Sequence, residues 1–302
     1  MGDEATFSDL ARKTTVGGLP RLLAGVLLIM RIHNCILGAV FVVVGAYLGS
    51  KATGIATVLS PNVFLGALAI SLSIAFANVI NDYHDAPADA LSKPHRPIPS
   101  GRISHHSAGI LALALGSAAT TIGWTISAPA GIMATALVVL SALYSYYLKN
   151  TVLLGNGLVA LLDASIIVYG GLVIDSLTQA IWLASLMLFL HVFAHEILYT
   201  LRDRAGDALA HLKTTATYLG TATSIRLFRI VVMVFVVVAL VPWFASLGPD
   251  LYLYTIVICT ILPTIIAVVM VRASTAEDNL RRATWVMKSV WFFSILPIAL
   301  LK

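Results

Sequence analysis

The sequence predicts an all-α membrane protein with nine transmembrane helices around a central cavity. Hydrophobic residues make up 59% of its 302 residues and charged residues only 11%, whereas a soluble globular domain carries about 25% charged residues. The mean hydropathy is +0.93. The apolar residues are gathered in runs of about twenty, which is the length a helix needs to cross a bilayer. We therefore expect residues 1–302 to form a single transmembrane domain.

The nine expected spans are separated by polar connections, of which residues 82–106 and 200–224 are the longest. They cover residues 22–48, 62–81, 107–126, 130–148, 153–173, 178–199, 225–246, 251–271 and 283–301. Residues 1–20 contain acidic side chains and no apolar run, so they do not resemble a signal peptide and are expected to stay in the cytoplasm. Cys35 and Cys259 both lie inside apolar runs. They are therefore expected to be small buried side chains and not a disulfide or a metal site.

Lysine and arginine residues are concentrated on one side of the predicted bundle. With nine spans, only Lys51 and Lys302 fall on the side opposite the amino terminus. The positive-inside rule therefore places the amino terminus in the cytoplasm and the carboxyl terminus outside. The net charge of +5 describes one basic face, which attracts anionic lipid or a diphosphate and does not imply nucleic acid. We expect a plasma-membrane protein whose active site opens toward the cytoplasm.

An acidic stripe closes the second span. Asn81, Asp85 and Asp89 are spaced at i, i+4 and i+8, which places their side chains on one face if the helix continues. Their oxygens suit magnesium, an ion that joins one or two carboxylates to substrate phosphates. Asp82 points about 100° away from this stripe on an ideal helix, so it is a weaker candidate ligand.

Basic residues follow the acidic stripe closely. Lys93 and Arg96 come within a few residues of Asp89, and Lys149 and Lys213 follow later spans on the same predicted side. All four are candidate contacts for phosphate oxygens, because arginine forms paired hydrogen bonds there and lysine acts as a point charge. The alternative for each base is an ordinary loop charge of the positive-inside kind.

A second acidic stripe closes the sixth span. Glu196, Tyr199, Asp203 and Asp207 lie at offsets of 0, 3, 7 and 11, which is one face of a helix. The second and sixth spans run in the same direction, so their acidic ends should emerge together and face each other across the cavity. We assign Asn81, Asp85 and Asp89 to one magnesium ion, and Asp203 and Asp207 to another, so that two ions bridge one diphosphate.

Three segments resemble the UbiA superfamily of intramembrane prenyltransferases. The run NDYHDAPAD…KPHRPIPSG is similar to the first aspartate-rich motif of that family, and EILYTLRDRAGD is similar to the second. The intervening YSYYLKNTVLLGN resembles branches that make chlorophyll, archaeal ether lipids and prenylated quinols. The resemblance implies transfer of a prenyl group from an isoprenyl diphosphate inside the membrane. It also supports Arg96 and Lys213, which match family positions.

Three further residues are candidates for catalysis, and a fourth for substrate binding. Glu196 and Tyr199 lie deeper in the membrane than Asp203; Glu196 either orients or deprotonates the acceptor, or supports the metal site from behind. Asp163 lies in the middle of a span, where an isolated acid is costly and indicates function. Its alternative is pairing with a neighbouring helix through His191 or Arg31. Asn34 interrupts the first span and could line the cavity.

The acceptor is the least determined part of the prediction. The leading expectation is a small aromatic acceptor, although Lys149 is followed by Asn150 where hydroxybenzoate enzymes tend to carry a second base. Glu196 and Gly206 resemble the ether-lipid branch, which leaves a glycerol-phosphate lipid acceptor open. A membrane terpene cyclase of the same superfamily would need no acceptor at all. A cation transporter ranks far lower, because its acids should lie at the bilayer midplane and not at helix ends.

Overall fold

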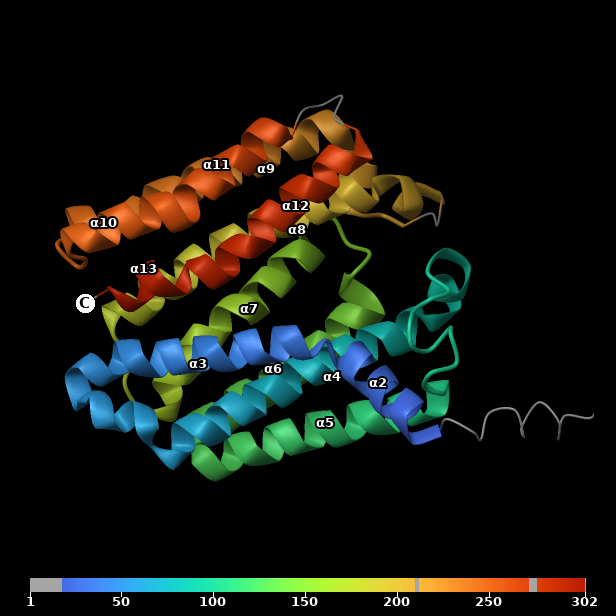
Figure 1. Cartoon of the computed structure of the whole chain (residues 1–302), viewed down its shortest axis with the longest axis horizontal. Helices are drawn as coiled ribbons and strands as arrows, with labels where there is room; N and C mark the ends of the chain where they lie inside the picture. Colours follow the sequence, from blue (N-terminus) through green and yellow to red (C-terminus); the bar gives the residue numbers. More distant parts are fainter. Residues whose placement is uncertain (1–17, 210–211, 272–275, 302) are drawn as a thin grey trace, which may run out of the picture.

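The computed structural model describes residues 18–209, 212–271 and 276–301, and within them the chain is helical (Figure 1). Residues 1–17 of the expected cytoplasmic segment lie outside this description. The α-helices are α2 (Gly18–Met30), α3 (Ile32–Thr53), α4 (Pro61–Ser92), α5 (His105–Ile126), α6 (Ala128–Leu143), α7 (Leu154–Val173), α8 (Gln179–Leu209), α9 (Thr215–Phe244), α10 (Asp250–Ile256), α11 (Leu262–Met270), α12 (Glu277–Phe293) and α13 (Ile295–Ala299). A 3-10 turn (Ile55–Leu59) precedes α4, and π-helical turns (Tyr144–Leu148 and Val257–Ile261) extend α6 and join α10 to α11.

Eight helical segments of the described chain are long and apolar enough to cross a membrane. They correspond to the first eight expected spans, and the protein is an integral membrane protein. The ninth expected span, 283–301, is built from α12 and α13, which meet at Ser294. Because α12 carries charged residues along its first half and is only 17 residues long, its length and composition do not identify it as a span. The helix count and the membrane orientation therefore stay predictions.

The helices run roughly parallel or antiparallel to one another, with α2 to α6 on one side of the molecule and α9 to α13 on the other (Figure 1). The pairs α4–α5, α8–α9, α7–α8 and α3–α7 have the most extensive contacts. Helices α4 and α8 end at the same end of the bundle, where α12 begins (Figure 1). The carboxyl ends of α4 and α8, the amino end of α12 and the break between α2 and α3 therefore lie close together.

Helices α3 and α7 approach so closely that their backbones touch. A Cβ atom on Gly45 would collide with the Ile167 carbonyl oxygen, and one on Gly170 would collide with the Val42 carbonyl oxygen. Small residues allow this approach in membranes, where packing and not the hydrophobic effect holds helices together. The contact lies in the half of each helix that is farther from the acidic motifs.

Candidate active site

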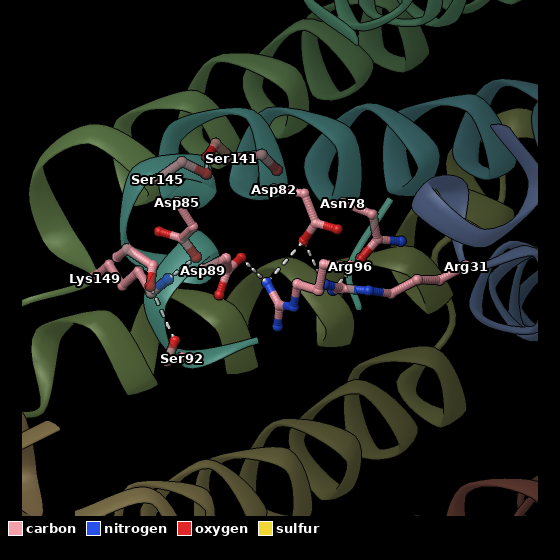
Figure 2. Close-up of polar contacts among 11 residues, drawn as sticks. Arg31, Asn78, Asp82, Asp85, Asp89, Ser92, Arg96, Ser141, Ser145 and Lys149 are labelled. Carbon is pink, nitrogen blue, oxygen red and sulfur yellow. Dashed lines mark hydrogen bonds and ion pairs between the residues drawn. The ribbon is translucent and has the colours of Figure 1, made fainter. Parts of the chain in front are cut away.

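The last turns of α4 present four polar side chains on one face: Asn78, Asp82, Asp85 and Asp89, at offsets of 0, 4, 7 and 11 (Figure 2). Helix α4 continues beyond the expected end at residue 81, through Pro87 to Ser92. Asp82 and Asp89 are buried, with 5% and 4% of their surface exposed. Buried carboxylates need partners, since an unpaired charge is costly to remove from water.

Basic side chains pair with every carboxylate of this face (Figure 2). The Nη1 atom of Arg96 lies 2.6 Å from Asp89 Oδ2 and 3.2 Å from Asp82 Oδ1. Lys149, which directly follows the π-helical turn after α6, forms an ion pair with Asp85. Acids and phosphate-type bases therefore lie side by side, as the sequence predicted for this motif.

Arg31 completes the network, although the sequence analysis named Asp163 as its possible partner. It stands between α2 and α3 with φ 51° and ψ 60°, in the left-handed region. Its guanidinium donates to Asn78 Oδ1 (2.8 Å) and to Asp82 Oδ1 (2.7 Å), and Asn78 Nδ2 donates to the Met30 carbonyl (3.0 Å) (Figure 2). Asp82 thus accepts from two arginines at once. The expectation that Asp82 points away from the acidic stripe is therefore wrong. Asp82 is two helical turns from Asp89 and lies on the same face of α4.

Helix α8 carries the second acidic stripe at the same end of the bundle. Arg202 donates two hydrogen bonds to its neighbour Asp203, of 2.6 Å from Nε to Oδ1 and 2.9 Å from Nη2 to Oδ2. The same guanidinium lies 3.9 Å above the Tyr199 ring, a cation–π contact. Arg202 was not among the residues expected in the site, because a basic residue beside a motif aspartate could equally have pointed to solvent.

The two motifs face a common space. Asp207 of α8 lies within electrostatic range of Lys149 and Lys93, although Lys149 is itself bound to Asp85 of α4. Tyr144 lies within range of acids from both helices. A cavity of about 540 Å³ opens beside them, between the α2–α3 break, the segment after α4, α8 and α12. Its walls include the expected residues Asn34, Lys93, Arg96, Tyr199 and Asp203, and the carboxylates of α4 lie outside its wall. The structure therefore brings the two acidic stripes together.

Other expected residues lie outside the cavity wall. Asn81 is half-buried and lies outside the ion-pair network. The asparagine side chain that takes part in this network is that of Asn78. Lys213 is exposed before α9. Asp163 and Glu196 lie deeper in the bundle, close enough for their carboxyl groups to interact. The two alternative partners of Asp163 are engaged elsewhere: Arg31 binds Asp82, and His191 Nε2 lies 3.0 Å from the Met287 carbonyl oxygen.

The donor set fits magnesium that is shared with a phosphate-bearing ligand. Within residues 18–209, 212–271 and 276–301, no three His, Cys, Asp or Glu side chains form a ready-made metal cluster. Magnesium seldom uses a cage made only of protein, and it usually takes one or two carboxylates together with phosphate oxygens and water. Asp85 and Asp89 on α4 and Asp203 and Asp207 on α8 supply such carboxylate pairs.

The sequence pattern of the UbiA prenyltransferase family matches residues 36–295. The chain belongs to the UbiA prenyltransferase family. It is 35% identical over 210 residues to the digeranylgeranylglyceryl phosphate synthase of Methanopyrus kandleri, covering 70% of this chain and 75% of the relative. It is 32% identical over 278 residues to the protein of the same name from Metallosphaera sedula, covering 90% and 93%.

Solved structures of this family share the fold. A structure described as that of a digeranylgeranylglyceryl phosphate synthase in membranes has a TM-score of 0.74 at 23% identity, covering 92% of this chain and 97% of the other. A UbiA homologue from Aeropyrum pernix reaches a TM-score of 0.70 at 17% identity, covering 88% and 98%. One from Archaeoglobus fulgidus, bound to DMAPP and Mg²⁺, reaches 0.65 at 18% identity, covering 91% and 99%. As a member of the UbiA prenyltransferase family, the chain is an enzyme that transfers prenyl groups.

Proposed function

We propose that this enzyme is a magnesium-dependent prenyltransferase that moves a prenyl chain from an isoprenyl diphosphate to a glycerol-phosphate lipid. The observation that carries the proposal is the meeting of the α4 carboxylates, paired with Arg96 and Lys149, with the acidic end of α8 beside a cavity lined by basic residues. The UbiA homologue from Archaeoglobus fulgidus, bound to DMAPP and Mg²⁺ in one structure and to GPP and Mg²⁺ in another, supports the donor and the metal. The names of the relatives support the acceptor.

Two magnesium ions and the basic residues would hold the donor diphosphate. Asn81, Asp85 and Asp89 are assigned to one ion, and Asp203 and Asp207 to the other. Bound magnesium neutralises the charge that develops on the leaving diphosphate. The bases assigned to the diphosphate oxygens are Lys93, Arg96, Lys149 and Lys213. Lys149 and Arg96 are the strongest of these, because they already lie against the motif carboxylates.

The reaction then proceeds by breaking one carbon–oxygen bond and forming another. The bond between the allylic carbon and the diphosphate breaks, and its electron pair leaves with the diphosphate. The acceptor hydroxyl oxygen attacks the allylic cation, and its proton passes to a base. Glu196 is assigned as that base, with Asp163 within electrostatic range to support it and Tyr199 and Asn34 lining the cavity. Excluding water from the bundle interior protects the cation from hydrolysis.

The comparisons favour the glycerol-phosphate acceptor over the aromatic acceptor that was the leading expectation from the sequence. The relatives from Methanopyrus kandleri and Metallosphaera sedula are both named as synthases of a glyceryl phosphate lipid. The match to the second covers 93% of that relative's length. Asn150 beside Lys149 fits this choice, since it leaves that position without the second base of hydroxybenzoate enzymes. We infer one domain over the whole chain, in the plasma membrane, with a cytoplasmic opening at the ends of α4 and α8.

The proposal is tested with the full chain purified in detergent with Mg²⁺ and geranylgeranyl diphosphate. An alkyl glycerol phosphate and a hydroxybenzoate are offered in parallel, and products are measured by mass spectrometry. We expect a product whose mass equals donor plus glycerol phosphate lipid minus diphosphate. An adduct with the hydroxybenzoate alone would restore the aromatic acceptor, and a hydrocarbon or alcohol formed without any acceptor would indicate a cyclase.

A further inference from the structure

The cavity carries more positive charge than the donor-binding acids can compensate. Its walls hold six cationic side chains, Arg31, Lys93, Arg96, Arg202, Arg281 and Lys288, but only two acidic ones, Asp203 and Glu277. Both acids are already paired with arginines, Asp203 with Arg202 and Glu277 with Arg281 at 3.1 Å. Nearby Asp82 and Asp89 accept from Arg31 and Arg96. Two lysines, Lys93 and Lys288, form no ion pair in the described part of the chain, and of these Lys93 has an acid, Asp207, within electrostatic range.

Lys288 of α12 is a half-buried ammonium group among like charges. In the part of the chain that the structure describes, no carboxylate forms an ion pair with it. The charged groups within its electrostatic range are Arg31 and Arg202, which are both cations. Its ring contact with Trp285 is long, at 5.9 Å from Nζ to the ring centroid. Arg31 and Arg202 are paired with Asp82 and Asp203, but Lys288 beside them is not, and its uncompensated charge costs free energy that a bound anion would recover.

The position of Lys288 is set by the packing of α12. Ala283, Met287 and Val290 are buried against the bundle, and His191 of α8 lies 3.0 Å from the Met287 carbonyl oxygen. On a helix, Arg281, Thr284 and Lys288 lie at offsets of 0, 3 and 7, so they share the face that lines the cavity. Lys288 is therefore held at a fixed wall of the cavity.

This wall differs from the one to which the donor diphosphate is assigned. The bases that act on Asp85, Asp89 and Asp207 are Lys149, Arg96 and Lys93, which come from the α4 side and from the end of α6. Helix α12 packs on α8 and α11, and it lies in the other half of the molecule from α4 (Figure 1). A diphosphate held between the two acidic motifs would leave the charge of Lys288 unused.

We propose that Lys288, between Arg31 and Arg202, binds the phosphate monoester of the acceptor lipid. A phosphate monoester carries about −1.5 to −2 charges at neutral pH, and a lysine ammonium contacts it as a point charge. The inference rests on the proposed function, because it assigns a residue to the acceptor named there. It explains how one cavity holds two phosphate-bearing substrates: acids and metals face the donor, and a surplus cation faces the acceptor.

Binding of two lipid probes to the Lys288→Met variant tests the proposal. The probes are 1-O-hexadecylglycerol phosphate and 1-O-hexadecylglycerol, which lacks the phosphate, with Mg²⁺ and pyrophosphate present throughout. We expect a loss of about ten- to a hundredfold in affinity for the phosphate-bearing probe, little change for the other probe, and partial rescue by Lys288→Arg. Arg282→Met is the matched control, since Arg282 is an exposed residue of the same helix. Size-exclusion profiles and thermal unfolding identify any variant that fails to fold.

Three outcomes would overturn the assignment. An equal loss of affinity for both probes would show that Lys288 packs against the lipid and does not bind its phosphate group. A loss of affinity for magnesium pyrophosphate would place Lys288 in the donor site. Unchanged affinity for both probes would remove it from the site altogether. If wild-type protein binds the phosphate-bearing probe through Lys288 but forms no transfer product with it, the proposed function fails while the anion site stands.

Discussion

Asp82 shows how a single residue joins the ends of three segments. Its carboxylate accepts from Arg31 at the α2–α3 break and from Arg96 after α4, and Arg96 continues to Asp89. The sequence predicted Asp85 and Asp89 with their neighbouring bases, because local spacing reveals them. It could not predict the pairing of Arg31 with Asp82, since 51 residues separate the two and only the tertiary fold brings them together. Lys288 was missed for the same reason, whereas Arg202 was missed because the sequence does not show whether a basic residue beside Asp203 points to it or to solvent.

The ion pairs of the α4 carboxylates predict that a metal ion without diphosphate binds weakly, because it competes with basic side chains for the same oxygens. In Lys149→Met the Asp85 carboxylate loses its partner, so Mn²⁺ offered without diphosphate should bind up to about fivefold more tightly, as expected when an ion pair worth up to about 1 kcal/mol no longer competes. Affinity for magnesium pyrophosphate should fall instead, because a phosphate contact is gone. Electron paramagnetic resonance of free Mn²⁺ measures the first effect and calorimetry the second.

Arg204→Met provides the control, because it removes the same charge from an exposed position beside the second motif. Weaker Mn²⁺ binding in Lys149→Met would mean that Lys149 supports the metal site and does not compete for it.

Among the elements, α4 and α8 explain what hydropathy detects and what it misses. The apolar pattern placed their ends near residues 81 and 199, yet the helices run to Ser92 and Leu209. Hydropathy marks the part of a helix that lies in the hydrocarbon, whereas the functional turns continue into the polar region beyond it. The ninth expected span differs for a related reason: α12 combines a charged first half with buried Ala283 and Met287, so it is a helix but not a uniformly apolar one.

The close contact of α3 with α7 predicts a position that is intolerant of a single methyl group. In Gly170→Ala the new Cβ atom would collide with the Val42 carbonyl and with the backbone of α3. Overpacking of this kind costs about 1–3 kcal/mol. We expect a lower midpoint of thermal unfolding in detergent.

Gly157→Ala is the matched control on the same helix, because its nearest neighbour, a Phe193 ring carbon, would lie at an ordinary 4.0 Å. Equal unfolding midpoints for the two variants would show that α3 and α7 separate easily.

For the whole molecule, the distribution of charge predicts which end faces the cytoplasm. The ends of α4 and α8 carry the basic loops, and the turn after α3 lies at the other end of the bundle (Figure 1). In a background without Cys35 and Cys259, His95→Cys should react with a membrane-impermeant maleimide only after cells are opened. Ala56→Cys should react in intact cells. Both positions are exposed, and the reversed labelling pattern would contradict the assigned orientation.

The glycine contact between α3 and α7 also determines how the bundle can move. About fourteen residues, or roughly 21 Å along a helix, separate Gly45 from Arg31, so the tightest backbone contact and the charged cavity lie near opposite ends of α3. Backbones already in contact leave no side chains between them that could rearrange. We therefore expect any widening of the bundle around a long prenyl chain to occur at the acidic end and not at the glycine contact.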